Sequence, residues 1–292
     1  MKTASVAADV RTLLGEGPVW DPRSSLLYWI DIEGQALYSL DPSREGQVNK
    51  MSLGQRPGAL VLRETDGAVL AAENGFFFLD MSSGKLEEIT NPEEHVANNR
   101  FNDGKADPAG RFWAGTMEEE GKKHQGSLYC LNTDMTAQRK LQNLSISNGL
   151  AWSRDNKYFY LIDTPESKVF QFHYQLDTGS ISEKRTAITF PEDAGSPDGM
   201  TIDEEGMLWI AHFGGGRISR WNPDSGQMLE EVSIPAPNVT SCVFGGENLN
   251  TLYITTASIG MSDEELEKFP KAGSLFQYEP SVAGTVLNYF KG

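Results

Sequence analysis

A short phrase recurs six times along this 292-residue chain, each time before an apolar strand rich in aromatic residues. In four of the copies it is an oxygen-bearing residue followed by glycine. The copies are Glu16-Gly17, Pro57-Gly58, Asp103-Gly104, Asn148-Gly149, Asp198-Gly199 and Thr240-Ser241. A repeat of roughly 40 to 50 residues built from short strands is typical of a β-propeller, with one blade per repeat. We therefore expect an all-β fold, a single six-bladed β-propeller domain over residues 1–292.

The first repeat shows how one blade is built. Residues 18–21, 26–32, 36–40 and 48–53 have the composition of four strands separated by turn residues. Residues 4–12 and 285–290 are also strand-like, so one or both ends of the chain are expected to complete the last blade. The one helix signal lies in the sixth repeat, where Ser262 and Glu265 form a capping box.

The bulk composition excludes several classes of partner. The net charge of −16 repels nucleic acid and anionic membranes, so neither is expected as a partner. No apolar stretch approaches the roughly 20 residues of a membrane span, and residues 1–10 do not resemble a signal peptide. Cys130 and Cys242 fall in opposite blades and are expected to be buried free thiols. These features favour the cytoplasm.

The phrase occupies the same position in every repeat, so its residues should converge on the central axis. Glu16, Asn148 and Asp198 would then offer carboxylate and amide oxygens to a hard divalent cation. Taken singly, each is equally an ordinary turn residue. Asp103 shares the position but has Lys105 close by, so we place it outside the metal shell as a supporting or structural carboxylate.

The third repeat holds the densest run of polar residues. Arg100 could hold substrate oxygens with its forked donors, and Asn102 could donate to a carbonyl group or a water. The alternatives are a surface salt bridge and a turn amide. The charged loop at residues 117–126 could act as a lid whose Glu120 touches substrate, or could simply be solvated.

Other catalytic and binding motifs are missing. The chain has no Gly-x-Ser-x-Gly nucleophile elbow, and its four histidines show no metal-ligand spacing. The glycine-rich run at residues 213–217 lies between two strands, so it is expected to be a hairpin and not a phosphate loop.

Several longer phrases resemble the senescence marker protein/gluconolactonase/luciferin-regenerating enzyme family. They cover nearly the whole chain in the family's order, at residues 14–20, 99–105, 107–111, 114–117, 147–152, 197–200, 208–211 and 215–217. The resemblance implies a six-bladed propeller with one divalent metal ion, held by Glu16, Asn148 and Asp198. It also implies substrate contacts from Arg100, Asn102 and, through a loop shorter than in animal members, Glu120.

The implied activity is hydrolysis of sugar lactones such as glucono-1,5-lactone, a reaction of carbohydrate metabolism. The metal ion would polarise the lactone carbonyl, and Asp198 would act as general base on the attacking water. The identity of the metal ion stays open among Ca²⁺, Zn²⁺, Mn²⁺, Mg²⁺ and Fe²⁺. The sequence also leaves open whether the protein is a monomer or a weak homodimer. Two alternatives are a promiscuous metal-dependent esterase or phosphotriesterase, and a calcium-binding propeller without catalysis.

Overall fold

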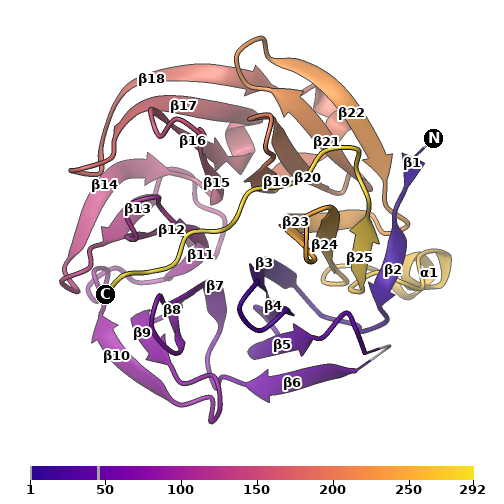
Figure 1. Cartoon of the computed structure of the whole chain (residues 1–292), viewed down its shortest axis with the longest axis horizontal. Coiled ribbons are helices and arrows are strands. Elements are labelled where there is room, and N and C mark those ends of the chain that lie inside the picture. Colours follow the sequence, from indigo (N-terminus) through magenta and orange to yellow (C-terminus); the bar gives the residue numbers. More distant parts are fainter. Residues whose placement is uncertain (1, 45–46) are drawn as a thin grey trace.

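Six β-sheets surround a central axis in the computed structural model, which describes residues 2–44 and 47–292 (Figure 1). Each sheet is one blade, with its first strand nearest the axis and its last at the rim. The first three blades are β3 (Gly15–Asp21), β4 (Leu26–Asp31), β5 (Ala36–Leu40), β6 (Val48–Ser52); β7 (Pro57–Leu62), β8 (Ala68–Ala72), β9 (Gly75–Leu79), β10 (Leu86–Thr90); and β11 (Asn99–Ala106), β12 (Phe112–Glu118), β13 (Gly126–Leu131), β14 (Ala137–Leu144). The six-bladed propeller predicted from the repeats is confirmed.

The other three blades follow in the same order. They are β15 (Ser147–Trp152), β16 (Tyr158–Asp163), β17 (Lys168–Gln175), β18 (Ser180–Thr189); β19 (Ser196–Ile202), β20 (Leu208–Phe213), β21 (Arg217–Asn222), β22 (Gln227–Ser233); and β23 (Asn238–Gly245), β24 (Thr251–Ala257), β25 (Leu275–Tyr278). Two short 3₁₀ helices, η1 (Thr164–Glu166) and η2 (Glu192–Ala194), lie in the fourth blade and after it. The helix α1 (Asp263–Lys268) begins after Ser262, whose capping box with Glu265 is formed as predicted.

The N-terminal segment closes the ring. Strand β2 (Ser5–Ala8) pairs with β25 as the fourth strand of the sixth blade, so the first and last parts of the described chain share one sheet. The short β1 (Lys2–Thr3) adds to the rim of the fifth blade, parallel to β22. Pairing distant parts of the chain in one sheet removes an open edge that would otherwise be exposed.

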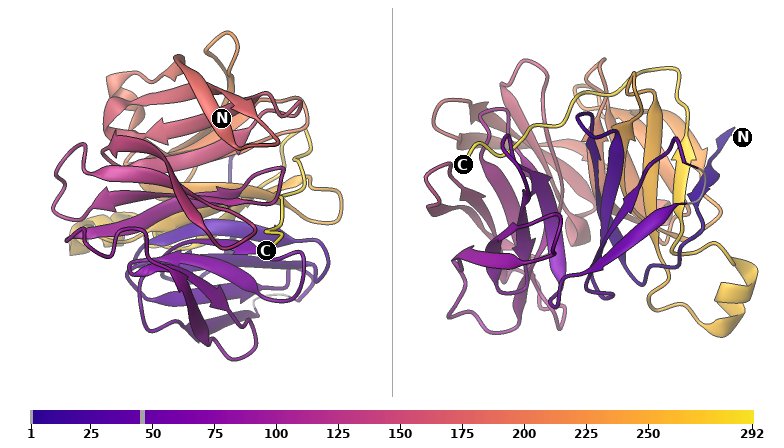
Figure 2. Two further views of the ribbon diagram at one scale, coloured as in Figure 1. Left: turned by 90° about the vertical axis from the view of Figure 1, so that its left-hand side faces the viewer. Right: turned by 60° about the horizontal axis from the view of Figure 1, so that its bottom comes forward.

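The C-terminal segment does not behave as the sequence suggested. Residues 285–290 form no strand of any blade; their only ladder contact among the described residues is an isolated bridge between Phe290 and Arg63. Of the two ends expected to complete the last blade, only the N-terminal one does so, through β2; residues 285–290 are strand-like in sequence but form no strand. The segment instead crosses one face of the ring as an extended strap, residues 284–292 (Figures 1 and 2). Leu287 and Tyr289 line the cavity at the axis while Val286 between them in the sequence is exposed, and this alternation accounts for the strand-like pattern.

The strap bonds to the last residues of four inner strands. Thr285 Oγ1 donates to the Ile202 carbonyl at 3.3 Å, and Asn288 Nδ2 to the Ala106 carbonyl at 3.2 Å. The Tyr289 hydroxyl lies 3.1 Å from Asp21, and the Phe290 N–H donates to the Leu62 carbonyl at 2.8 Å. The strap therefore covers the end of the central channel at which these strands finish.

Aromatic side chains between neighbouring blades dominate the core. The second strands of the first, third and fifth blades contribute Trp29, Trp113 and Trp209, which are fully buried. The Trp113 and Trp209 indoles each donate to an aspartate at the end of their own blade's inner strand, Asp107 at 2.8 Å and Asp203 at 2.9 Å. Because a buried indole N–H needs an acceptor, these aspartates are structural and fix the inner strand to the second one.

Both cysteines are free and buried, as predicted. Burial raises the pKa of each thiol to about 12, so neither is a reactive thiolate at neutral pH.

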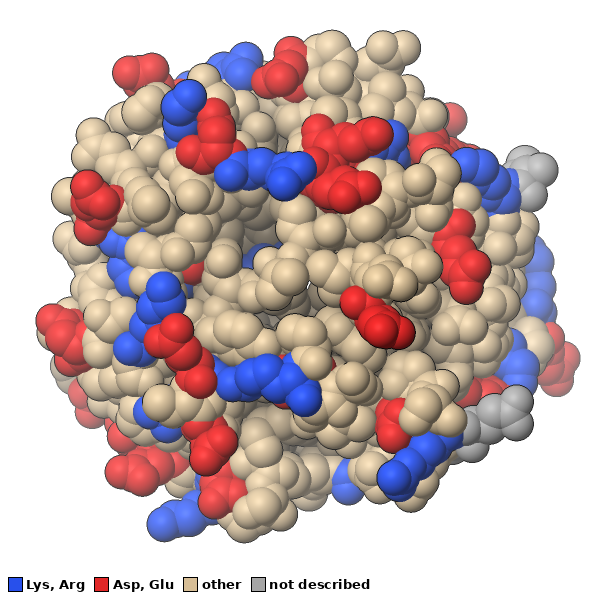
Figure 3. Space-filling view, in the orientation of Figure 1, with Lys and Arg blue, Asp and Glu red and all other residues tan. Residues whose placement is uncertain are grey.

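Acidic and basic side chains alternate around the rim of the face crossed by the strap, while its centre is mostly uncharged (Figure 3). Among the described residues, no helix is long and apolar enough to cross a membrane.

His212 at the end of β20 should make the fold sensitive to acid. It is buried and contacts Ser219 Oγ at 2.5 Å, and burial lowers its pKa from 6.5 to about 4. The native state therefore favours neutral His212. Its contribution to stability is complete above about pH 6.5 and is lost as the pH falls toward 4, by up to about 3 kcal/mol. In His212→Gln the free energy of unfolding, measured with urea, should fall less between about pH 6.5 and pH 4 than it does in the wild type. His173→Gln, at an exposed position, should keep the wild-type slope; an unchanged slope in both would contradict the prediction.

The strap should contribute to global stability through Phe290. This side chain is fully buried among residues of the second and third blades, so Phe290→Ala leaves a cavity. We expect a loss of about 3 to 4 kcal/mol in the free energy of unfolding. Val286→Ala is the control, because Val286 is 58% exposed and should change stability little. Equal small effects for both substitutions would mean that the strap is dispensable.

Candidate metal centre and active site

The recurring phrase marks a β-bulge in every inner strand. In all six blades the pairing between the first and second strands shifts register at the phrase. A bulge re-aims side chains and is common beside active sites. The glycine that follows allows adjacent inner strands to approach. A Cβ on Gly149 would lie 2.8 Å from the Asp198 carbonyl oxygen, and one on Gly199 would lie 2.2 Å from Ser241 Oγ.

Three carboxylates from three blades lie close together where these bulges meet. Glu16, Asp103 and Asp198 are all buried. Burial, and then the charge of Asp103, raise the pKa of Glu16 from 4.5 to about 8. Burial also raises the pKa of Asp198, with further contributions from Glu16 and Asp103, while the Asn148 amide and the Gly199 N–H act in the opposite direction. These like charges strongly disfavour ionisation of one another unless a positive charge is nearby.

Two cationic side chains lie beside the carboxylates. Arg100 lowers the pKa of Glu16, and Lys105 lowers that of Asp103, although burial of Asp103 has the larger, opposite effect. The Lys105 ammonium donates to the Met200 carbonyl at 2.7 Å, and burial lowers its pKa. Asp103, which the sequence places two residues before Lys105, therefore belongs to the same carboxylate cluster as Glu16 and Asp198.

A chain of hydrogen bonds connects Arg100, Asn102 and Asn148. Arg100 Nη1 donates to Asn102 Oδ1 at 3.0 Å, and Asn102 Nδ2 donates to Asn148 Oδ1 at 3.3 Å. Asn148 Nδ2 donates to Thr164 Oγ1, which in turn donates to the Pro197 carbonyl, both at 2.9 Å. The chain runs through three blades and ends at the residue before Asp198. It fixes the Asn148 amide so that its oxygen faces Asn102, on the same side as the substrate residues expected from the sequence.

Glu120 lies at the surface of the loop after β12. Its side chain is 64% exposed and pairs with Lys122 Nζ at 2.7 Å. Its neighbour Glu119 lies 3.8 Å from Arg100 Nε and also pairs with Arg56 Nη2. A substrate contact by Glu120 stays a prediction, and in this arrangement Glu119 is the loop carboxylate nearest to Arg100.

Sequence reasoning missed Arg56, Glu119 and Thr164. Arg56 precedes the phrase Pro57-Gly58 and binds Glu73 at 2.7 Å as well as Glu119. Arg56 could have been found from the sequence. It lies one residue before a repeat phrase, and residues near these phrases are expected to lie near the axis. Nothing in the sequence distinguished Glu119 from Glu118 and Glu120, because the conformation of the loop decides which of them turns inward.

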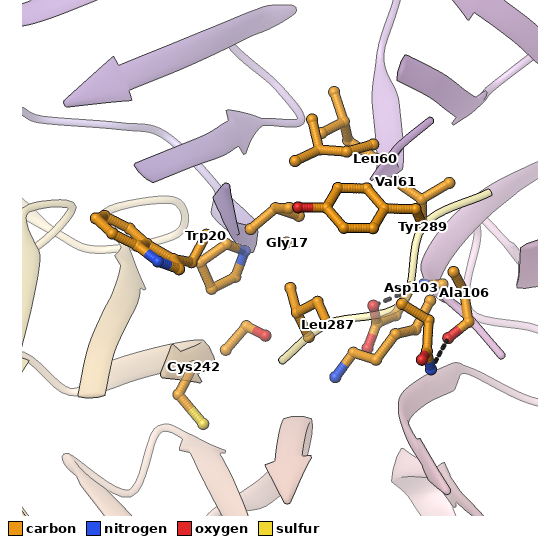
Figure 4. Close-up of a pocket in the computed structure, with 16 residues that line it drawn as sticks. Gly17, Trp20, Leu60, Val61, Asp103, Ala106, Cys242, Leu287 and Tyr289 are labelled. Carbon is orange, nitrogen blue, oxygen red and sulfur yellow. Dashed lines mark hydrogen bonds between the residues drawn. The ribbon is translucent and has the colours of Figure 1, made fainter. Parts of the chain in front are cut away.

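The channel behind the cluster is nearly filled. Between the carboxylates and the strap lies a cavity of about 30 Å³, bordered by Asp103, Lys105 and Cys242 on the ring side and by Leu287 and Tyr289 of the strap (Figure 4). Such a volume holds a water molecule or two and no sugar. Glu16, Asn148 and Asp198 occupy the second or third position of their strands, whereas the strap covers the last positions. A substrate would therefore approach from the face opposite the strap.

The oxygen donors fit a hard divalent cation. Glu16 and Asp198 supply carboxylates, and Asn148 supplies an amide oxygen, which accepts a hydrogen bond from Asn102 in this structure. The mutual repulsion of the buried carboxylates is the electrostatic environment that a cation relieves. Among the described residues, no group of three or more His, Cys, Asp and Glu side chains has the arrangement of a metal site, so a site here would have to include the Asn148 oxygen.

Comparison with known proteins agrees with this architecture. The family model for the SMP-30/gluconolactonase/LRE-like region matches residues 14–258. The chain belongs to this family. The family name is the one that the phrases of the sequence suggested.

Members of the SMP-30/gluconolactonase family resemble the chain over nearly its whole length. It is 39% identical over 282 residues to the protein named "Putative sugar lactone lactonase YvrE" of Bacillus subtilis, covering 96% of both chains. It is 42% identical over 266 residues to regucalcin of Danio rerio, covering 90% of both. A solved structure described as a calcium-binding protein, regucalcin, from Agrobacterium tumefaciens superimposes with a TM-score of 0.95 at 26% identity, covering 100% of this chain and 98% of the other.

Arg56 should hold the loop after β12 in place. In Arg56→Met the loop loses its contact through Glu119, and local opening should become easier by roughly 1 kcal/mol. Trypsin should then cleave after Lys122 or Lys123 roughly fivefold faster under native conditions, as followed by mass spectrometry of the fragments. Arg139→Met removes an exposed arginine from β14, in the blade that carries the loop, and should leave the rate unchanged. Equal cleavage rates in the two variants would show that Arg56 does not restrain the loop.

Proposed function

We propose that this protein is a metal-dependent lactonase that opens aldonolactones such as glucono-1,5-lactone. The single observation that carries the proposal is the cluster of buried, mutually repelling carboxylates beside Asn148, which hydrogen bonds connect to Asn102 and Arg100. A scaffold protein gains nothing from burying these charges, because each raises the cost of the others. The names of a lactonase and a calcium-binding regucalcin among the relatives support the same proposal.

Glu16, Asn148 and Asp198 would hold one divalent cation, whose chemistry is to polarise the lactone carbonyl and to lower the pKa of a nearby water. The all-oxygen donor set is compatible with Ca²⁺, Mg²⁺ and Mn²⁺, and also with Zn²⁺ or Fe²⁺. The positive charge would favour the ionised forms of Glu16 and Asp198, whose pKa values are otherwise raised.

Asp198 would act as the general base. Its carboxylate takes a proton from water as the water oxygen bonds to the lactone carbonyl carbon. The ring C–O bond then breaks, the ring oxygen takes up the proton held by Asp198, and the new carboxylic acid loses its proton to solvent to leave as the aldonate. Arg100 and Asn102 would orient the sugar hydroxyls, because both line the same hydrogen-bond chain as Asn148. Arg100 is ready for this role since only one of its terminal nitrogens, Nη1, donates within that chain.

Chelation and metal addition test the proposal. The chelator-treated protein should lose turnover of gluconolactone and recover it with at least one single divalent metal. Asp198→Asn should reduce kcat by at least about 100-fold in the metal-restored protein. Asp193→Asn, an exposed carboxylate shortly before the same strand, should keep wild-type activity. Turnover that survives both chelation and Asp198→Asn would refute the mechanism.

The same assay separates the alternatives. Turnover of aryl esters or phosphotriesters alone would favour a promiscuous esterase. Absence of turnover with every metal, together with a calcium-dependent rise in Tm, would favour a calcium-binding propeller without catalysis. The cytoplasmic location and the monomeric or weakly dimeric state inferred from the sequence stay predictions.

A further inference from the structure

Two arginines from neighbouring blades face the same carboxylate oxygen beside the candidate centre. Arg56 directly precedes β7 of the second blade, and Arg100 lies in β11 of the third. Arg56 Nη2 pairs with Glu119 Oε1, and Arg100 Nε lies 3.8 Å from the same oxygen. Glu119 belongs to the loop after β12, so a single loop carboxylate serves two cations that the ring itself carries.

Arg56 is held in place by groups outside this loop. Its Nε donates to Glu73 Oε2 at 2.7 Å, and its Nη1 lies 3.7 Å from Glu33 Oε1. Glu73 follows β8, and Glu33 lies in the turn between β4 and β5. Each of the three nitrogens therefore faces a different carboxylate, and only Nη2 depends on Glu119. If the loop moves, Arg56 keeps its two other partners, and Nη2 becomes available to a new anion.

Arg100 is a buried cation that lacks a close carboxylate among the residues that the structure describes. Its side chain is 9% exposed, and its Nη1 donates to the Phe101 carbonyl and to Asn102. The 3.8 Å to Glu119 is longer than a hydrogen bond. Burial lowers the pKa of Arg100, and the charge of Arg56 lowers it further. Two like charges, one of them buried, favour an anion that contacts both.

Glu119 is free to give up its position. Its side chain is 33% exposed, whereas its neighbours Glu118 and Glu120 both pair with Lys122 inside the loop. Of these three glutamates, Glu119 is the one that reaches an arginine of another blade. Guanidinium groups present several N–H donors in a geometry that matches a carboxylate. A carboxylate brought by a ligand would meet the same donors.

We propose that Glu119 occupies the place of a ligand carboxylate, and that Arg56 and Arg100 bind the carboxylate of a sugar acid when Glu119 moves away. That the ligand is a sugar acid rests on the proposed lactonase function, in which Arg100 orients sugar hydroxyls and the reaction produces an aldonate. The carboxylate could belong to this product or to a substrate lactone that carries a second, free carboxylate. The experiment therefore has one arm for binding and one for turnover.

The binding arm does not depend on catalysis. Ligand-observed NMR with the full-length chain would compare gluconate with sorbitol, an uncharged polyol of the same length. Glu119→Gln removes the competing carboxylate, so gluconate should bind at least about fivefold more tightly than to the wild type, while sorbitol binding stays within about twofold. Glu94→Gln removes the same charge at an exposed position in the loop before β11 and should bind gluconate like the wild type. Equal gluconate binding in all three proteins, or none in the wild type and Glu119→Gln, overturns the proposal.

Arg56 separates a carboxylate site from a loop that merely covers the centre. Adding Arg56→Met to Glu119→Gln should weaken gluconate binding at least about fivefold, because one of the two guanidinium groups is lost. Arg56 lies outside the proposed metal shell, so the loss cannot come from a missing metal ligand. If Glu119→Gln instead strengthens gluconate and sorbitol binding equally, and Arg56→Met has no further effect, the proposal is refuted.

The turnover arm identifies the source of the carboxylate. If it is the product, gluconate should inhibit hydrolysis of gluconolactone, with an inhibition constant about fivefold lower in Glu119→Gln. If it is the substrate, kcat/KM for the 1,4-lactone of glucaric acid should rise about fivefold in Glu119→Gln, while that for gluconolactone stays within about twofold. Gluconate binding with neither change would overturn the link to the lactone and identify a site for a free sugar acid. Absence of lactonase activity in the wild type would refute the proposed function, while the binding arm would still decide the role of the two arginines.

Discussion

The close packing of like charges on the propeller axis is the interaction on which the rest of the site depends. Glu16, Asp103 and Asp198 come from three blades and are buried together, so each raises the cost of ionising a neighbour. Arg100 and Lys105 offset part of this cost. The ring is rigid enough to maintain the arrangement because every blade is a paired sheet and the N-terminal strand closes the last one.

The two ends of the channel have different roles. At one end, bulges in the inner strands turn the oxygen-bearing residues inward, and the chain of hydrogen bonds from Arg100 to Pro197 connects them. At the other end, the strap bonds to the last residues of four inner strands and leaves only a small cavity. Access to the carboxylates is consequently limited to one face, and the loop that carries Glu119 lies on that side, next to Arg100.

Much of the fold could be predicted because a repeat translates directly into symmetry. Residues at equivalent places in six similar units must lie at equivalent places around an axis, so Glu16, Asn148 and Asp198 could be grouped without any structure. Local signals sufficed for the third strand of the first blade and for the cap at Ser262. The same local reasoning failed for residues 285–290. Alternating apolar residues indicate that one side of an extended segment is buried, but they do not indicate whether a neighbouring strand or another surface covers that side.

The sequence by itself determined the number of blades and the grouping of Glu16, Asn148 and Asp198 at the axis, since both follow from periodicity. Only the tertiary structure decided that Asp103 shares the charge of that group, and that the loop carboxylate near Arg100 is Glu119 and not Glu120. The physical reason is that burial, charge coupling and hydrogen-bond satisfaction depend on distances between blades. Those distances are set by how the whole ring packs, and no single segment encodes them.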